Sequence, residues 1–329
     1  MPVRNAAATV ARAVASIQGQ TLRDWELIAI DDGSKDASRF ILIEMAQTDP
    51  RIRILRTKSG LVGALNAGLA AASGEFVARM DADDESAPSR LERQAQHLQA
   101  DPQLGLVGCA VAYGGDRTMQ AGYALHVDWV NTLLTPEEIA LNRFIESPFA
   151  HPSVMFRRAL VEAHGGYREG DFPEDYELWL RWLDAGVPMA KVPELLFTWN
   201  DLPDRLSRTD PRYAPEAFYR LKARWLAEWL KHDLEPGRAV WIWGAGRPTR
   251  QRAAHLVAHG VTIAGYIDVD AKKTGRKVGG VPVVAEADLP PRENSFILGY
   301  VGTRGARDYI RNVLGKSGRT EGADFLMCA

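Results

Sequence analysis

The sequence predicts an α/β fold with two domains, and three observations support this. Helical and strand-like apolar spacings alternate along the N-terminal half, which is typical of βα units around a largely parallel sheet. The chain of 329 residues exceeds what one hydrophobic core usually serves, about 250–300 residues. A fresh strand follows the break at Glu235-Pro236-Gly237-Arg238. We therefore expect a larger domain over 1–233 and a smaller α/β domain over 238–329.

The elements of the larger domain follow in order from apolar spacing and turn residues. Val10, Val14 and Ile17 recur at helical spacing, and a helix between 36 and 49 ends at Asp49-Pro50. The forty residues after Tyr113 show no period and are expected to be irregular. Further strands are expected at 25–30, 52–55, 75–80, 104–113 and 153–156, and further helices at 61–72, 90–99, from 174 onward and at 219–231.

Composition excludes several classes of protein. With 25% charged and 46% hydrophobic residues, the chain has the composition of a soluble globular protein. A net charge of −2 argues against nucleic acid as the main partner, which would require a surplus of Lys and Arg. Cys109 and Cys328 make no disulfide framework, so a cytoplasmic location is expected. No apolar stretch approaches the roughly 20 residues of a membrane span. Membrane contact is therefore expected to be peripheral, at the inner face.

Two acidic turns follow predicted strands, Asp31-Asp32 and Asp81-Ala82-Asp83. Because ligands of open parallel sheets bind at the carboxyl ends of the strands, both turns point to one crevice. Carboxylates one residue apart supply the hard oxygen ligands of Mg²⁺ or Mn²⁺, ions that are commonly shared with nucleotide phosphates. The alternative is a solvated acidic turn that caps the next helix.

The order of motifs resembles family 2 glycosyltransferases. The resemblance implies a GT-A catalytic domain and a metal-dependent, inverting transfer of a sugar from a nucleotide-diphospho-sugar, expected to be a UDP-sugar. It also implies a carbohydrate or lipid-linked acceptor and a role in cell-surface polysaccharide assembly. The stretches that carry it are PVRNAAATVARAVASIQGQT at 2–21, DWELIAIDDGSKD at 24–36, GLVGALNAGLAAASGEFVARMDADD at 60–84, SPFAHPSVMFRR at 147–158, GGYREGDFPEDYELWLRW at 165–182 and DRLSRTDPRY at 204–213.

The resemblance assigns roles on the donor side. Asp32 matches the residue that binds the nucleobase, in a pocket that Pro2 and Asn5 would line. Asp83 matches the metal ligand, and Asp81 would lie near the ribose and the metal. Lys58 and Asn66 are further candidates for donor contact. Arg205 and Arg208 are candidate diphosphate clamps, because guanidinium groups match phosphate oxygens, with an exposed solubilising loop as the alternative.

On the acceptor side, Asp175 of the Glu174-Asp175 pair matches the catalytic base of the inverting enzymes. Inversion by single displacement requires one base that takes the proton of the acceptor hydroxyl. The alternative for Asp175 is a carboxylate that stabilises a helix N-terminus. His151 and Glu174 are expected on the acceptor side, with a structural hydrogen-bonding role as the alternative for His151.

The smaller domain begins with a strand, the turn Gly244-Ala245-Gly246 and a helix, and a second strand ends at Asp268. Asp268 follows Gly244 by 268 − 244 = 24 residues, close to the spacing at which an acid meets a ribose in dinucleotide-binding folds. Thr249 replaces the third glycine of that motif. We expect a Rossmann-like domain with Gly244, Gly246 and Asp268 as a candidate second nucleotide site, or a structural or oligomerising role.

Two other functions remain open on the sequence alone. One is an oxidoreductase or modifier of sugar nucleotides centred on the Gly244-Ala245-Gly246 turn. The other is an inactive module that binds sugar nucleotides.

The N-terminus departs from the family pattern. Met1-Pro2-Val3-Arg4-Asn5 begins at the P-x-x-N turn, where family members usually have an apolar strand ahead of it. Three or four buried apolar side chains contribute roughly 1.5–3 kcal/mol each, close to the net stability of a domain. We therefore expect the first strand to be missing and the native protein to carry additional upstream residues.

Overall fold

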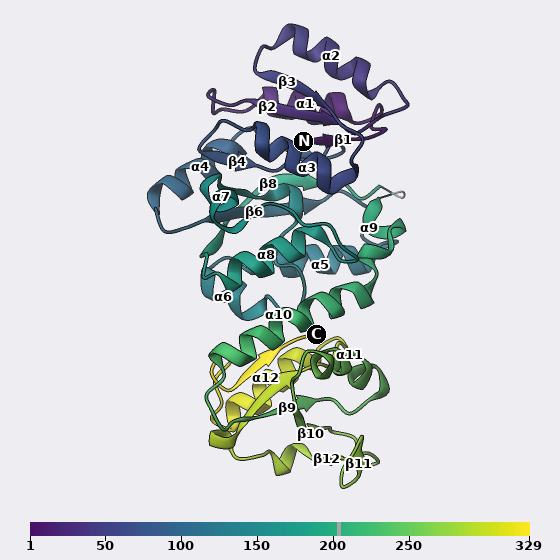
Figure 1. Cartoon of the computed structure of the whole chain (residues 1–329), viewed down its shortest axis with the longest axis vertical. Coiled ribbons are helices and arrows are strands. Elements are labelled where there is room, and N and C mark those ends of the chain that lie inside the picture. Colours follow the sequence, from purple (N-terminus) through teal and green to yellow (C-terminus); the bar gives the residue numbers. More distant parts are fainter. Residues whose placement is uncertain (203–204) are drawn as a thin grey trace. The chain divides into compact units, whose positions relative to one another are not determined.

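The computed structural model describes residues 1–202 and 205–329, which form two compact units (Figure 1). The first unit comprises 1–139, 148–170 and 174–209, and the second comprises 140–147, 171–173 and 210–329. Helix α10 (Pro215–Asp233), which the sequence analysis assigns to the first domain, therefore belongs to the second unit. The reason is that α10 packs against α11 (Arg247–Ala258).

The elements of the first unit alternate as the apolar spacings predict. Its strands are β1 (Pro2–Val3), β2 (Leu27–Asp31), β3 (Ile52–Arg56), β4 (Phe76–Ala78), β5 (Glu85–Ser86), β6 (Leu106–Tyr113), β7 (Met155–Arg157) and β8 (Met189–Trp199). Its helices are α1 (Val10–Gln18), α2 (Ser38–Thr48), α3 (Gly60–Ala71), α4 (Arg90–Ala100), α5 (Ala121–Thr132), α7 (Ala159–His164), α8 (Glu174–Asp184) and α9 (Leu206–Thr209). Helix α6 (Pro136–Asn142) spans the boundary between the units.

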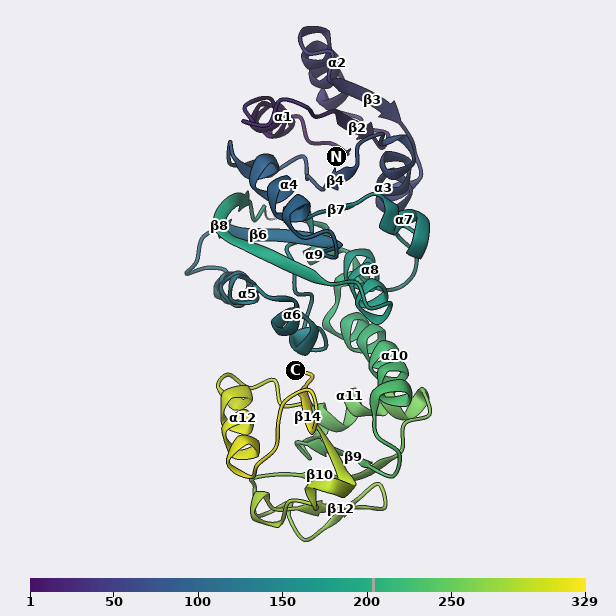
Figure 2. The ribbon, with the colours of Figure 1, turned by 90° about the vertical axis from the view of Figure 1, so that its left-hand side faces the viewer.

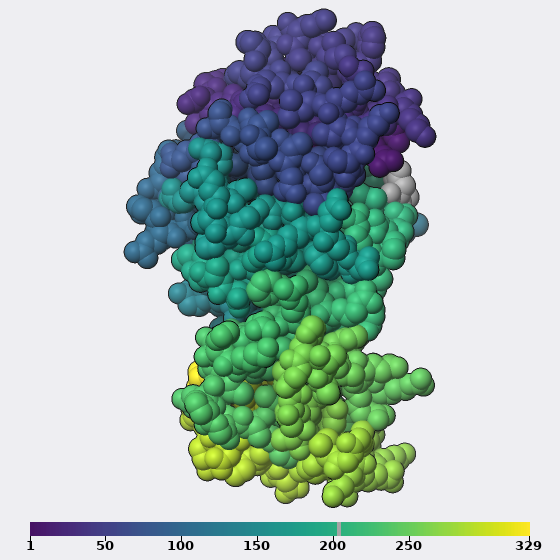
Figure 3. Space-filling view, in the orientation of Figure 1, coloured from purple at the N-terminus to yellow at the C-terminus, as the bar shows by residue number. Residues whose placement is uncertain are grey.

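A parallel sheet of order β1-β2-β3 carries the first acidic turn. Pro2 and Val3 form β1, which the sequence analysis did not predict, and pair with Ile30 and Asp31 of β2. A further strand ahead of the P-x-x-N turn stays a prediction. Val3 is buried there. Every residue of β2 is buried, since α1, α2 and α3 flank this sheet, and the carboxyl end of β2 delivers Asp31 and Asp32 into a turn. Figure 3 shows the residues of this part of the chain, in purple to dark blue, as one continuous surface.

A five-stranded mixed sheet of order β4-β7-β6-β8-β5 forms the centre of the first unit. Strands β6 and β8 run parallel, and α4 covers one face of this pair while α5 covers the other (Figure 2). Strand β7 is antiparallel to both β4 and β6, and β5 is antiparallel to β8. The core beside this sheet contains Trp179 and Trp182 of α8, both fully buried.

The segment after Tyr113, expected to be irregular, contains α5 and α6. Ala124, Val127 and Val130 recur every three residues on α5, and they are its buried positions. Polar and aromatic residues at the other positions hide this period, so the sequence pattern alone did not reveal the helix.

The second unit contains a six-stranded sheet of order β11-β12-β10-β9-β13-β14. Leaving out the antiparallel edge strand β11, the order along the chain is 3-2-1-4-5, as in Rossmann folds, and all these strands are parallel. A Rossmann-like topology is therefore present. Besides α10 and α11, its elements are β9 (Ala239–Trp243), β10 (Ile263–Ile267), β11 (Lys277–Val278), β12 (Val281–Val284), β13 (Ser295–Gly299), α12 (Ala306–Lys316) and β14 (Phe325–Met327).

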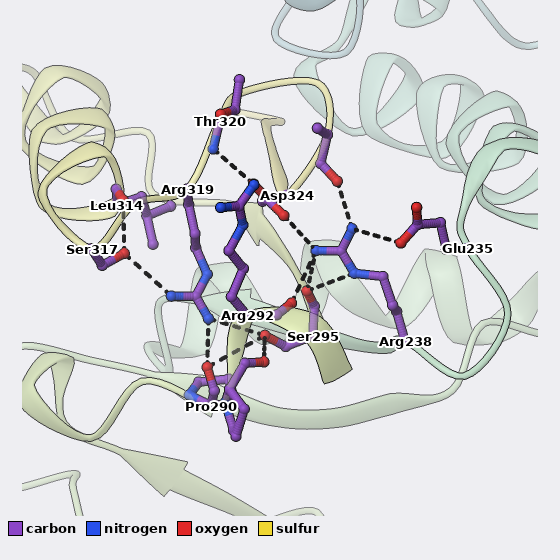
Figure 4. A network of polar contacts seen from close by, with 12 residues as sticks. Glu235, Arg238, Pro290, Arg292, Ser295, Leu314, Ser317, Arg319, Thr320 and Asp324 are labelled. Carbon is purple, nitrogen blue, oxygen red and sulfur yellow. Dashed lines mark hydrogen bonds and ion pairs between the residues drawn. The ribbon is translucent and has the colours of Figure 1, made fainter.

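A network of arginines around Asp324 joins three loops at the amino ends of this sheet (Figure 4). Asp324 Oδ1 accepts a hydrogen bond from Arg238 Nη2 at 2.9 Å, and Asp324 Oδ2 accepts from the Thr320 amide at 2.8 Å and lies 2.9 Å from Arg292 Nη2. Arg238 also donates to the Ser295 carbonyl, and Arg319 donates to the Ser295 hydroxyl. Asp324 and Arg238 are both buried, so their charges neutralise each other away from solvent.

Over residues 1–202 and 205–329, no helix combines the length and the apolarity needed to cross a membrane.

Candidate active site

The first acidic turn places Asp32 at the N-terminus of α3. Asp32 Oδ1 accepts hydrogen bonds from the Thr57 hydroxyl and the Ser59 amide, both at 2.9 Å, and from the Gly60 amide at 3.2 Å. Asp32 Oδ2 faces Arg4 Nη1 at 3.7 Å. Asp32 is buried, and its Oδ1 accepts three hydrogen bonds, which fixes the orientation of Oδ2.

The N-terminal turn is tied to the same acidic turn. Asn5 adopts a left-handed conformation with φ of 52°, and its Oδ1 accepts from the Lys35 amide at 2.8 Å. The Asn5 amide donates to the Ser34 hydroxyl at 3.1 Å. Lys58 is exposed, and its aliphatic stem lies close to Gly33. A Cβ added to Gly33 would lie only 3.2 Å from Lys58 Cγ. Pro2, Asn5, Asp32 and Lys58 thus lie together at one parallel sheet, near the carboxyl end of β2, and their contact with a donor stays a prediction.

The second acidic turn brings three carboxylates together. Asp81, Asp83 and Asp84 each offer an oxygen, and these oxygens lie within 4.8 Å of one another. Burial raises the pKa of Asp83 to about 6, with the charge of Asp81 as the next cause, and it raises the pKa of Asp84 well above its usual range. Asp84 Oδ2 is buried and has no hydrogen-bond partner in the described part of the chain. An unsatisfied buried carboxylate oxygen among hard oxygen donors fits a Mg²⁺ or Mn²⁺ ion.

Arg205 lies near this triad, and Asn200 contacts both Arg205 and the triad. Arg208 lies in the short helix α9 that follows. The Asn200 amide donates to Asp84 Oδ1 at 2.8 Å, and Asn200 Nδ2 donates to the Asp83 carbonyl at 2.8 Å. Arg205 is near enough for its charge to oppose the rise in the pKa of Asp83. Asp204, the first residue of the DRLSR motif, lies outside the described residues.

Arg79 joins the acidic turn to His151. Arg79 Nη1 lies 2.8 Å from Asp81 Oδ1, and Arg79 Nε donates to His151 Nε2 at 3.2 Å. Burial, and then the charge of Arg79, lowers the pKa of His151 well below its usual range, so its imidazole is neutral. Since arginine can only donate, Nε2 is the acceptor nitrogen, and the Tyr167 hydroxyl at 2.8 Å donates to it as well. The proton of His151 therefore sits on Nδ1, 4.0 Å from Glu174 Oε1.

Asp175 lies in the first turn of α8, next to Glu174. Burial raises the pKa of Asp175 to about 7, with the charge of Glu174 as the next cause, while Arg79 acts in the opposite direction. Burial raises the pKa of Tyr167 above its usual range, and the charges of Glu174, Asp175 and Asp81 act in the same direction. The contacts from Asp81 through Arg79 and His151 to Glu174 therefore connect the acidic turn to the first turn of α8.

Both polar atoms of the Asn66 side chain are hydrogen-bonded to the backbone of Tyr167. Its Nδ2 donates to the Tyr167 carbonyl at 2.9 Å, and its Oδ1 accepts from the Tyr167 amide at 3.0 Å. Arg181 of α8 donates to the carbonyls of Gly165 and Gly166 in the same loop. These bonds hold the loop that presents Tyr167 to His151, and donor contact by Asn66 stays a prediction.

In the second unit, the candidate nucleotide residues lie at the expected strand ends. Gly244 has a φ of 111°, and a Cβ there would lie 2.8 Å from Val301. Asp268 accepts from the Ala245 amide at 2.8 Å and from the Asp270 amide at 2.9 Å, and it contacts Lys273 at 3.2 Å. The chain itself thus uses both oxygens that would meet a ribose, and nucleotide binding by Gly244, Gly246 and Asp268 stays a prediction.

Sequence reasoning missed Arg79 and Tyr167. It also missed Tyr113 and Asp201, where the Tyr113 hydroxyl donates to Asp201 and Asp201 pairs with Arg208. Arg79 and Tyr167 lie within motif stretches, directly before Met80-Asp81 and after Gly165-Gly166, so their position could have drawn notice. Tyr113 and Asp201 lie in no motif, and only the pairing of β6 with β8 brings them together.

Residues 1–165, half of the chain, match the family model described as glycosyl transferase family 2. The chain belongs to glycosyltransferase family 2. It is 32% identical to the amylovoran biosynthesis glycosyltransferase AmsE of Erwinia amylovora over 187 residues, which is 55% of this chain and 66% of that protein. It is 29% identical to the UDP-Glc:alpha-D-GlcNAc-diphosphoundecaprenol beta-1,3-glucosyltransferase WfgD of Escherichia coli, again over 55% of this chain and 66% of that protein.

The fold of this family 2 glycosyltransferase is similar to the crystal structure of S. aureus TarS 1-349. The TM-score is 0.54 at 18% identity, covering 78% of this chain and 67% of that one. At this identity the likeness shows the fold, and it confirms the GT-A prediction.

Proposed function

We propose that this glycosyltransferase moves a sugar from a nucleotide-diphospho-sugar, most simply a UDP-sugar, to a carbohydrate or lipid-linked acceptor with inversion at the anomeric carbon. The observation that carries the proposal is the cluster of Asp81, Asp83 and Asp84, with Arg205 near Asp83 and with contacts from Asp81 through Arg79 and His151 to Glu174, the neighbour of Asp175. The relative WfgD is named for a UDP-Glc donor and a lipid diphosphate acceptor, and AmsE for polysaccharide biosynthesis. The name of WfgD supports this choice of donor and acceptor, and the name of AmsE supports the setting.

On the donor side, Asp32 Oδ2 is the oxygen free to accept an N–H of the nucleobase, because Oδ1 already takes three bonds. Arg205 and Arg208 supply positive charge for the diphosphate. A divalent ion held by Asp81, Asp83 and Asp84 would neutralise the charge that develops on the leaving nucleoside diphosphate.

On the acceptor side, Asp175 takes the proton of the acceptor hydroxyl as that oxygen attacks the anomeric carbon. A general base works best with a pKa near the working pH, and burial brings the pKa of Asp175 to about 7. Neutral His151 presents Nδ1 at 4.0 Å from Glu174 Oε1. After burial, the charge of Glu174 is the next cause of the raised pKa of Asp175.

Calorimetric titration with UDP, in the presence and absence of Mn²⁺, tests the donor and metal assignments. We expect the full chain to bind UDP more tightly with Mn²⁺, and Asp83→Asn to lose that gain while retaining its melting temperature. The loss is expected because the variant lacks one of the three carboxylate charges. Equal Mn²⁺-dependence in the variant and the parent would contradict the assignment of Asp83 as a metal ligand.

A further inference from the structure

Arg205 and Arg208 both lie beside a carboxylate that belongs to no sequence motif, Asp201. Its side chain is fully buried. Asp201 Oδ2 accepts from Arg208 Nη2 at 2.5 Å and from the Tyr113 hydroxyl, and Asp201 Oδ1 lies 3.9 Å from Arg205 Nη1. A buried carboxylate between two guanidinium groups restricts where both can point.

Aromatic rings support the same two arginines. The guanidinium carbon of Arg205 lies 4.5 Å from the ring centroid of Trp199, and that of Arg208 lies 4.9 Å from the ring centroid of Tyr123. Arg205 Nη1 also donates to the Asn200 carbonyl at 3.1 Å. Within residues 1–202 and 205–329, one nitrogen of each guanidinium has a hydrogen-bond partner, so most of the five N–H donors of each remain available.

The side-chain charges of Arg205, Arg208 and Asp201 together favour an anion. Arg205 and Arg208 bring two positive charges, and Asp201 brings one negative charge, so the cluster is net positive. Arg208 Nε has no hydrogen-bond partner among the described residues, so this guanidinium is not fully used by its pair with Asp201. A purely structural ion pair would commonly use more of these donors, whereas donors left unpaired beside surplus positive charge suit an anionic ligand. Asp201 Oδ1, also unpartnered there, is an acceptor and faces Arg205 at 3.9 Å.

The chain connects this cluster directly to the acidic triad. Asn200, the neighbour of Asp201, holds Asp84 through its amide and Asp83 through its side chain. Two consecutive residues after β8 therefore fix both the carboxylates and the arginines. A diphosphate bound between a divalent ion and two arginines requires such a constant separation.

We propose that Asp201 is a positioning residue that aims Arg205 and Arg208 at the diphosphate of the donor and, through Asn200, keeps them in register with the acidic triad. The proposal rests on the proposed function, since it requires a nucleoside diphosphate at this turn. Asp201 itself touches no phosphate. Its effect is therefore expected on the diphosphate part of the ligand and not on the nucleoside part.

The test compares binding of UDP and of uridine to the full chain in Mn²⁺. Asp201→Asn keeps the size of the side chain and an oxygen that can accept from Tyr113, but it removes the charge that orients the arginines. We expect the Kd for UDP to rise by about tenfold or more, as for a lost hydrogen bond between charged groups, with the Kd for uridine unchanged. Tyr113→Phe, which keeps the carboxylate, should show a smaller rise for UDP alone. Asp128→Asn, which breaks the exposed Arg117–Asp128 pair, is the matched control and should change neither value.

Two results would overturn the proposal. In the first, Asp201→Asn binds UDP as tightly as the parent does. In the second, Asp201→Asn and Tyr113→Phe weaken UDP and uridine equally, which would make Asp201 a support of the fold alone. A parent protein that binds neither UDP nor GDP in Mn²⁺ would instead refute the proposed function, so the two failures are distinguishable.

Discussion

At the scale of single residues, Asp175 carries the sharpest chemical prediction. Asp175→Asn should keep the donor affinity but lower the transfer rate by a factor of about 10² or more, because general base catalysis supplies roughly 10²–10⁴. The amide has nearly the same size as the carboxyl group but cannot accept the proton. Initial rates at saturating donor, together with Kd values for UDP, measure both quantities. A parental transfer rate in the variant would remove Asp175 from the mechanism.

The pH dependence of the transfer rate follows from the same residue. Burial and the charge of Glu174 raise the pKa of Asp175 to about 7, with Arg79 opposing them. Only the ionised form accepts a proton, so kcat should rise as the pH increases through about 7 and then level off. Measured rates between pH 5.5 and 8.5 check this. A rate that stays flat over this range in the parent would contradict the raised pKa of the base.

At the scale of elements, the network of Figure 4 predicts where the second unit is most sensitive to mutation. Asp324→Asn leaves Arg238 and Arg292 facing each other without their shared carboxylate. Removing one partner of a buried ion pair typically costs about 3–5 kcal/mol. We expect a large fall in the free energy of unfolding of this unit, measured by urea denaturation. Asp128→Asn, at an exposed pair, should change stability by less than about 1 kcal/mol. Similar effects from both variants would show that the network contributes little.

The sequence predicted elements well where an apolar period and a turn signal coincided. Strand β9 has the bounds expected, and the acidic turns follow β2 and β4 as expected. The sequence analysis did not predict helix α5, because only three apolar residues, Ala124, Val127 and Val130, form its buried face. It did not predict strand β1, because two residues show no period and this strand depends on pairing with β2. Asp201 and Tyr113 could not be found from sequence, because their proximity arises from the register of β6 and β8.

At the scale of the whole molecule, we predict that donor binding requires the first unit and not the Rossmann-like sheet of the second. Every residue proposed for donor binding or base catalysis lies within 1–209, whereas the buried face of α10 packs in the second unit. A chain shortened to 1–233 should therefore bind UDP and Mn²⁺ with the affinity of the full chain. It should also melt at a lower temperature, since α10 loses its contact with α11. A folded 1–233 chain that fails to bind UDP would show that the second unit contributes to the donor site.

The most direct test of glycosyl transfer at the acidic turn is a panel of nucleotide sugars scored for metal-dependent release of the nucleoside diphosphate. Slow transfer to water requires the donor site and the triad but no knowledge of the acceptor. The proposed function predicts that the full chain releases the diphosphate from one or a few donors, UDP-sugars foremost. Release should require Mg²⁺ or Mn²⁺ and should be lost in Asp83→Asn. Release that persists in a chelator, or that is unchanged in Asp83→Asn, would contradict this assignment.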